Sequence, residues 1–200
     1  MNQYVNARIY NSKIYMMAVT AVMTAVTCIL APMSIPIGPV PISLTNLVIY
    51  IALYLLGWKM GTVSYLIYLV IGAVGVPVFS GFTAGAGRLL GPTSGYLIGY
   101  ILAALIAGKL CETRRKFIPA LISMLIGSIA CLALGTVWFM LVTHTALIPA
   151  LLVCVVPFIP GDIAKMAAAA AVGRILDERL ARSGLSIQKF EAGENPKRRV

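Results

Sequence analysis

Acidic residues are almost absent from this chain: six Asp and Glu stand against 16 Lys and Arg, and only 11% of its 200 residues are charged. A soluble domain carries about 25% charged residues. Here 60% of the residues are hydrophobic and the mean hydropathy is +0.94. These proportions exclude an ordinary soluble domain and predict one membrane domain over residues 1–200, with the lipid bilayer as its solvent. The basic residues are not clustered on a soluble face, so we expect no nucleic-acid partner.

Residues for catalysis and metal binding are also scarce. His144 is the single histidine, and the four cysteines have no metal-like spacing. The sequence contains no nucleotide-binding loop and no Ser-His-Asp or His-Glu-x-x-His arrangement. We therefore predict that the chain is not an enzyme, has no metal site and no cofactor, and carries no ATP-hydrolysing site of its own.

Six apolar spans predict an all-α membrane protein with six transmembrane helices, since a crossing needs roughly 20 apolar residues. The predicted helices cover about residues 14–31, 43–57, 61–78, 94–110, 117–142 and 149–176. Pro157, Pro160 and Gly161 interrupt the last span, so we expect a break at 157–161. The polar residues 183–200 are expected to form a flexible cytoplasmic tail.

The distribution of basic residues predicts the orientation. Cytoplasmic segments of membrane proteins carry an excess of Lys and Arg. With the N-terminus inside, 14 of the 16 basic residues fall on the inner side, and only Arg88 and Lys165 do not. Six crossings return the C-terminus to the same side. We therefore expect a multi-pass protein of the cell (cytoplasmic) membrane with both termini in the cytoplasm.

The first unusual outer loop is residues 32–46, which is apolar, uncharged and stiffened by Pro32, Pro36, Pro39 and Pro41. An apolar loop is unusual where it faces water. We interpret it as a lid over the helices, and a stiff connector is the alternative.

The second unusual loop is residues 79–96, which combines five glycines with Arg88. Glycine allows the backbone to approach a ligand closely, and Arg88 is the one fixed positive charge of the outer loops. The loop indicates a binding site, although a flexible hinge could also use the glycines.

The pair Asp162 and Lys165 lies inside the last apolar span. An ionisable group in a membrane segment is costly and usually marks a substrate or ion path. Residues three apart share a helix face, so a local ion pair is one interpretation. The other is a binding site, in which Asp162 accepts hydrogen bonds from a polar ligand and Lys165 or Arg88 pairs with an anionic group.

Four segments together resemble the BioY family. They are ProValProIleSerLeu at 39–44, LeuLeuGly at 55–57, LeuGlyProThrSerGlyTyr at 90–96 and PheIleProGlyAspIleAlaLys at 158–165. BioY proteins are the biotin-specific substrate-binding (S) components of energy-coupling-factor (ECF) vitamin transporters. The resemblance extends over residues 14 to about 180. It implies the six-helix S-component fold and high-affinity binding and uptake of biotin. It also implies two kinds of partner, a transmembrane coupling subunit of the EcfT type and two cytoplasmic ATPases.

The resemblance also implies a set of substrate-binding residues. Asp162 and Lys165 match the family's ProGlyAspxxLys motif, and Arg88 matches an arginine found before its GlyPro motif. Four further residues are expected at the site through their place in or beside the motifs: Asn46, Thr83, Gly91 and Tyr96. This chain has Thr45 where the family often has Gln, and Thr83 where some members have Asn.

Alanines in the first predicted helix indicate a partner surface. Ala18, Ala21 and Ala25 lie on one side of it, and Ala21 and Ala25 have the spacing that allows close helix approach. S components of this kind dock the coupling subunit through such a pattern. Internal packing is the alternative.

Two other functions stay open at this point. An S component for another small vitamin-like ligand would share the fold and the partners. A gradient-driven transporter would instead use Asp162 as a proton site.

Overall fold

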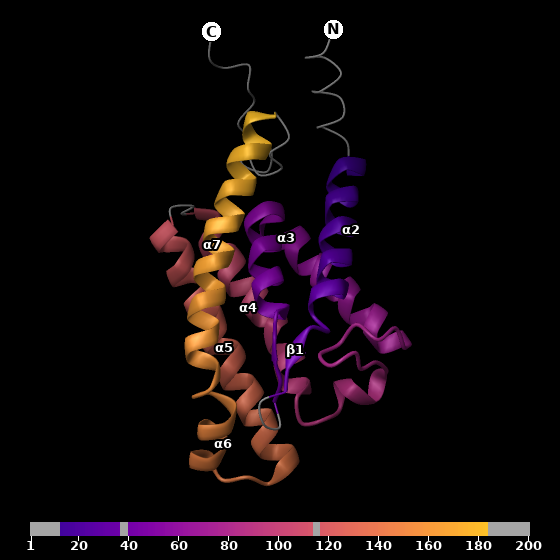
Figure 1. Ribbon diagram of the computed structural model, residues 1–200, viewed down its shortest axis with the longest axis vertical. Coiled ribbons are helices and arrows are strands. Elements are labelled where there is room, and N and C mark those ends of the chain that lie inside the picture. Colours follow the sequence, from indigo (N-terminus) through magenta and orange to yellow (C-terminus); the bar gives the residue numbers. More distant parts are fainter. Residues whose placement is uncertain (1–12, 37–39, 114–116, 184–200) are drawn as a thin grey trace, which may run out of the picture.

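Helices make up most of the structure (Figure 1), a computed structural model that describes residues 13–36, 40–113 and 117–183. The first half contains α2 (Lys13–Leu30), β1 (Ser34–Ile35), β2 (Ile42–Ser43) and α3 (Thr45–Val74). The second half contains the 3₁₀ turn η1 (Ala86–Leu89), α4 (Ser94–Thr113), α5 (Phe117–Thr143), α6 (Leu147–Cys154) and α7 (Phe158–Arg182). The predicted tail lies outside the described residues apart from its first, Ser183. α2 begins and α7 ends at the same end of the molecule.

Helix α3 is two helices joined at a sharp bend, and this accounts for the second and third predicted spans. Gly57 has φ 75° and ψ 178°, a conformation that favours glycine, and it interrupts the helical backbone. A Cβ added to Gly61 would lie 3.2 Å from the Cα of Leu53. Eight residues of straight helix rise about 12 Å, so the chain must fold back at Gly57. We call the two arms α3a (residues 45–56) and α3b (residues 58–74).

The third predicted span was too long at its end. Helix α3b stops at Val74, and Gly75 caps it in the left-handed region with φ 118°. The Gly75 N–H donates to the carbonyl of Gly72 at 3.2 Å. A left-handed glycine after the last turn is a common helix terminator, so residues 75–78 form a turn and not helix.

The break in the last span comes earlier than the sequence predicted. The non-helical residues are 155–157, and α6 meets α7 at a bend of 42°. Pro160 and Gly161 lie in the first turn of α7. Proline is tolerated there because first-turn N–H groups have no partner within the helix. Asp162 therefore lies just past the first turn.

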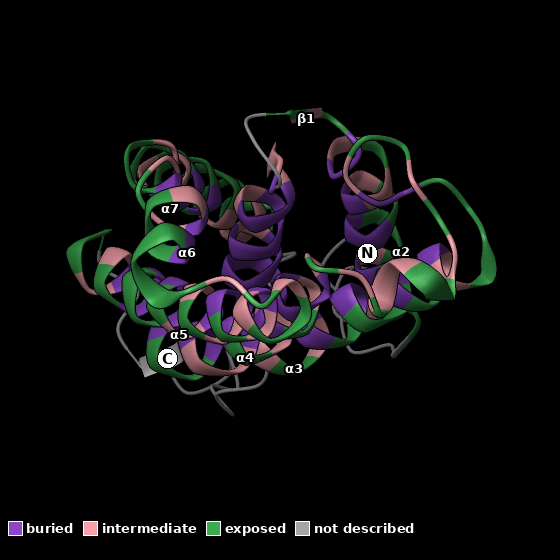
Figure 2. Ribbon diagram, turned by 90° about the horizontal axis from the view of Figure 1, so that it is seen from below, coloured by how far each residue is buried: buried purple, intermediate pink, exposed green. Residues whose placement is uncertain are grey.

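Exposed hydrophobic side chains cover the outside of the bundle, as lipid exposure requires. Ile118, Ile129 and Leu141 of α5 are 57–68% exposed. Within the described ranges, α3, α4 and α5 are long and apolar enough to cross a membrane, and α6 with α7 makes a fourth, bent candidate. Figure 2 shows the exposed faces on the periphery and a buried arm of α3 at the centre. With the arms of α3 counted separately and α6–α7 as one, the described fold has six helices.

Helices α4 and α5 pack closely because glycines line their contact. A Cβ on Gly99 would lie 3.0 Å from the Cys131 carbonyl oxygen, and one on Gly127 would lie 2.9 Å from that of Ala103. Gly135 of α5 lies directly under the ring of Tyr96. Larger residues at these points would push the helices apart and move Tyr96.

The β1–β2 hairpin and α6 lie at the end of the molecule opposite to the start of α2. Ser34 pairs with Ser43 and Ile35 with Ile42. The hairpin belongs to the proline-rich loop that the sequence analysis interpreted as a lid. Val40 is buried with Tyr96 and Phe158 in one hydrophobic cluster, whereas Met33 and Ile35 are more than half exposed. Among the described residues of this loop, Pro32 and Val40 are buried, whereas Met33, Ile35 and Pro36 are exposed.

Candidate functional site

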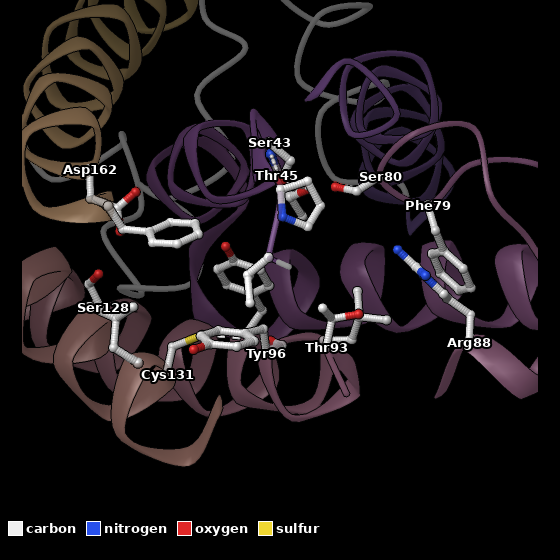
Figure 3. Close-up of a pocket in the computed structure, with 16 residues that line it drawn as sticks. Ser43, Thr45, Phe79, Ser80, Arg88, Thr93, Tyr96, Ser128, Cys131 and Asp162 are labelled. Atoms are coloured by element: carbon white, nitrogen blue, oxygen red, sulfur yellow. Dashed lines mark hydrogen bonds between the residues drawn. The ribbon is translucent and has the colours of Figure 1, made fainter. Parts of the chain in front are cut away.

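A cavity lies between the hairpin and helices α4, α5 and α7 (Figure 3). The hairpin side and the start of α3 contribute Val40, Pro41, Ser43 and Thr45. The glycine-rich loop and α4 contribute Phe79, Ser80, Arg88, Thr93, Tyr96, Leu97 and Tyr100, and α5 and α7 contribute Ser128, Cys131, Leu132, Phe158 and Asp162. Thr93, just before α4, and the three α4 residues follow the 3–4 spacing of one helix face.

Asp162 is a buried carboxylate at one side of this cavity, with 7% of the residue exposed. Its Oδ1 accepts a hydrogen bond from Asn46 Nδ2 at 2.7 Å and one from Lys165 Nζ at 3.2 Å. The Asn46 amide is held in turn, because its Oδ1 accepts the Leu47 N–H at 3.0 Å. Both bonds fall on Oδ1, and among the described residues no hydrogen bond reaches Oδ2. The second oxygen is therefore available as an acceptor.

Arg88 lies across the cavity from Asp162, as Figure 3 shows. Its backbone is fixed in η1, where its N–H donates to the Gly85 carbonyl at 3.1 Å. It makes no ion pair within the part of the chain that the structure describes. A guanidinium without a protein partner at a cavity wall can bind an anionic group through two parallel hydrogen bonds.

Aromatic rings cover the space between the two charged ends. The rings of Tyr96 and Phe158 are stacked, with centroids 6.5 Å apart and an interplanar angle of 13°. The Tyr96 hydroxyl lies 3.4 Å from both Thr136 Oγ1 and the Cys154 carbonyl oxygen. An apolar, aromatic cavity with a few polar groups at defined points is the usual form of a small-molecule site.

Three of the seven predicted substrate-binding residues line the cavity, namely Asp162, Arg88 and Tyr96. Asn46 is 2% exposed and does not line the cavity, but its side-chain amide donates a hydrogen bond to Asp162. Lys165 faces a neighbouring groove lined by Pro32–Ile35, Ile42–Leu44, Gly81 and Phe82. Lys165 does not line the cavity itself, but its ammonium donates a hydrogen bond to Asp162, which does.

Thr83 and Gly91 support the loops around the cavity and do not line it. The Thr83 hydroxyl donates to the Ser80 carbonyl at 3.0 Å, which holds the turn after Phe79. The Gly91 carbonyl accepts the Trp138 indole N–H at 3.0 Å and so ties the start of α4 to α5.

Several lining residues were not identified from the sequence. Ser128 and Cys131 come from α5, and the only sequence signal was a serine in a very apolar span. Tyr100 lies one helical turn after Tyr96, so extending the face of Tyr96 by four residues would have found it.

The predicted docking alanines lie on α2, and Ala18, Ala21 and Ala25 are all exposed. Ala21 and Ala25 line a shallow apolar groove between α2 and α3b, whereas Ala18 lies outside it. The other residues of this groove, which we call the α2–α3b groove, are Met17, Thr20, Thr24, Cys28, Met60, Val63, Ile67 and Ile71.

Comparisons with known proteins agree on one family. Residues 2–182 match the model of the BioY family. The biotin transporter BioY of Thermotoga maritima is 38% identical over 151 residues, which cover 76% of this chain and 89% of that protein. BioY2 of Lactococcus lactis is 34% identical over 156 residues, which cover 78% of this chain and 86% of that protein.

A solved structure has the same fold. It is the crystal structure of the S-component for biotin from an ECF-type ABC transporter, with a TM-score of 0.78 and 34% sequence identity. The match covers 84% of this chain and 93% of that one.

The Asn46–Asp162 hydrogen bond gives a prediction about stability. In Asn46→Leu the buried carboxylate loses its 2.7 Å donor, at a cost of about 1.5–3 kcal/mol. We expect a lower melting temperature in detergent at pH 5 and at pH 8. In Asn46→Asp two carboxylates meet at this distance, and a shared proton relieves their repulsion. This variant should therefore melt lower at pH 8 than at pH 5, by more than the wild type does. An unchanged melting temperature in both variants would contradict the assigned role of Asn46.

Proposed function

This chain belongs to the BioY family, and we propose from that membership and from its cavity that it binds biotin as the S component of an ATP-driven ECF transporter. The transporter would take up biotin across the cytoplasmic membrane. The chain itself is a substrate-binding subunit and not an enzyme.

The observation that carries this proposal is the polarity of the cavity. An acceptor, Asp162, and a cation, Arg88, lie at opposite sides, with aromatic rings between them. Biotin has a matching order of groups: a ureido ring with two N–H donors, an apolar thioether ring and a carboxylate at the end of a chain. Asp162 Oδ2 suits a ureido N–H, since charge-assisted hydrogen bonds are the strong ones in a low-dielectric site. The stacked pair Tyr96 and Phe158 suits the apolar ring.

The carboxylate is better matched to Arg88 than to Lys165. The Lys165 ammonium is already 3.2 Å from Asp162 Oδ1, and its side chain faces the neighbouring groove. Its role would be to orient the Asp162 carboxylate through this hydrogen bond. Arg88, by contrast, lines the cavity itself.

The orientation follows from charge and topology. The start of α2 and the end of α7 share one end of the molecule, and 14 of the 16 basic residues belong to segments assigned to that side. By the positive-inside rule that end is cytoplasmic and the hairpin end is outside. The cavity near the hairpin would then receive biotin from outside.

The partners are a coupling subunit of the EcfT type and two cytoplasmic ATPases. The α2–α3b groove is the surface we assign to the coupling subunit, because exposed alanines allow another helix to approach closely. The described chain offers no nucleotide-binding loop, so ATP hydrolysis is the partners' contribution.

Biotin binding by the purified full chain in detergent tests the function directly. Labelled biotin should bind, and excess thiamine or riboflavin should not displace it. Asp162→Asn should weaken binding by about 10- to 150-fold, since it removes a charged acceptor. A folded wild-type chain that binds no biotin, or binds riboflavin equally well, would refute the proposal.

A test of whether Arg88 binds the biotin carboxylate combines an Arg88 variant with a ligand that lacks the carboxylate charge. Arg88→Gln should weaken biotin binding by about 10- to 150-fold and leave the affinity for biotin methyl ester nearly unchanged. The ester lacks the charge that Arg88 would pair with. Lys165→Gln serves as the matched control and should affect both ligands alike. If Lys165→Gln gives the selective loss instead, the carboxylate belongs to Lys165.

The docking surface has a separate test. Ala25→Trp fills the α2–α3b groove and should leave biotin binding by the isolated chain unchanged. ATP-dependent uptake by cells that also make the coupling subunit and the ATPases should fall by about 10-fold or more, because overpacking costs about 1–3 kcal/mol. Ala133→Trp, on the exposed face of α5, is the control and should not reduce uptake. Equal uptake by the two variants would show that the groove is not the docking site.

A further inference from the structure

Two lysines from different helices lie at the ring of Trp58. Lys59 Nζ is 5.6 Å and Lys109 Nζ is 4.8 Å from the centroid of this ring. Lys59 belongs to α3b and Lys109 to the end of α4, and both are exposed. Because both distances end at one centroid, the two ammonium groups lie close together. Like charges repel each other, and an anionic group beside them would relieve this repulsion.

The backbone around Trp58 fixes the indole at this point. Gly57, with φ 75°, reverses the chain immediately before it. A Cβ added to Gly108 would lie 2.6 Å from the Trp58 Cβ, so glycine allows α4 to approach closely here. The Trp58 carbonyl accepts the Thr62 hydroxyl at 2.6 Å. The two lysines therefore converge on an indole that is part of the contact between α3b and α4.

An exposed apolar helix face leads to each lysine. Its members are Val63, Leu66 and Val70 on α3b, and Ile98 and Leu102 on α4, which are 38–61% exposed. Their spacing from Lys59 and from Lys109 is that of residues on one face of a helix. The two helices are neighbours, since the Tyr65 hydroxyl of α3b donates to the Leu97 carbonyl of α4 at 2.9 Å. In a bilayer such faces contact lipid acyl chains.

This cluster lies away from the biotin cavity. Helix α4 rises about 14 Å between the cavity residue Tyr100 and Lys109. In the proposed orientation this end faces the cytoplasm. Tryptophan is enriched where the hydrocarbon layer meets the headgroups, and basic pockets between transmembrane helices on the cytoplasmic side bind the headgroups of anionic lipids. Lys59 makes no ion pair within the described ranges, so its charge is available to such a headgroup.

We propose that Trp58, Lys59 and Lys109 form a binding site for an anionic phospholipid. Its phosphate lies beside the two ammonium groups, and its acyl chains lie along the exposed faces of α3b and α4. A zwitterionic lipid fits less well, because its own cation is repelled by the lysines. The bound lipid would connect α3b to α4 next to the bend at Gly57. None of the three residues lines the cavity, so the inference does not depend on biotin binding.

Quenching of tryptophan fluorescence by brominated phospholipids tests the site, since bromine quenches only on close approach. The chain has two tryptophans, and Trp138→Phe leaves only Trp58. In detergent, brominated phosphatidylglycerol should quench Trp58 at an about 30-fold lower concentration than brominated phosphatidylcholine. Lys59→Gln with Lys109→Gln should reduce this preference to about 2-fold or less, whereas Lys59→Arg with Lys109→Arg should keep it.

The matched control is Arg179→Gln with Arg182→Gln, which removes two exposed positive charges from the end of α7. It should leave the preference unchanged. If it abolishes the preference as the lysine pair does, only net charge matters and the site is refuted. Equal quenching by the two lipids in the unsubstituted background also refutes it. Excess glycerol phosphate should not displace the lipid. Displacement would show that the site takes a soluble phosphate and that the lipid assignment is wrong.

The melting temperature of the wild-type chain is a second measurement that does not require Trp138→Phe to fold. Phosphatidylglycerol should raise it more than phosphatidylcholine with the same acyl chains, and the lysine-to-glutamine pair should remove this difference. An equal rise with both lipids would contradict the site. Neither measurement uses biotin, so failure of the proposed function and failure of this inference are distinguishable.

Discussion

The hydrogen bond between Asn46 and Asp162 joins two parts of the chain that are 116 residues apart. It crosses an apolar environment, where a carboxylate without partners would be too costly to keep ionised. Asn46 at the start of α3 and Lys165 one turn along α7 both bind the same oxygen, which fixes the carboxylate and leaves its other oxygen for use. The position of α7 against α3, the direction of Asp162 and the polarity of the cavity all depend on this arrangement.

Much of the fold could be predicted because the bilayer imposes simple rules on the sequence. Apolar spans identified the helices, and the distribution of Lys and Arg indicated which end they share. The predictions of helix breaks were inaccurate where proline and glycine determine the backbone conformation. Proline and glycine at 160–161 suggested a broken helix, yet both fit the first turn of α7, so the break lies at 155–157. The sequence predicted the end of one span at Gly57 and the start of the next at residue 61, but the chain reverses at Gly57 itself, without a connecting loop.

The site could be predicted only where a residue was unusual for its surroundings. Asp162 and Arg88 were identifiable because a charge is rare in an apolar chain, and both line the cavity. Gly91 belongs to a family motif and Thr83 to the glycine-rich loop, but the sequence does not say whether such a residue contacts the ligand or shapes a loop. Ser128 and Tyr100 could not be chosen, since small polar and aromatic residues are frequent in packed membrane helices.

The shortness of α3a has a consequence for the origin of the cavity. Residues 45–56 rise only about 18 Å, whereas the hydrocarbon layer is about 30 Å thick. Helix α3a is therefore too short to span the hydrocarbon layer by itself, and the β1–β2 hairpin precedes it in the chain. Non-helical backbone at membrane depth is tolerated only where protein buries it or where it lines a cavity. Because α3 begins only at Thr45, the non-helical chain before it contributes the wall of the cavity at Val40, Pro41 and Ser43.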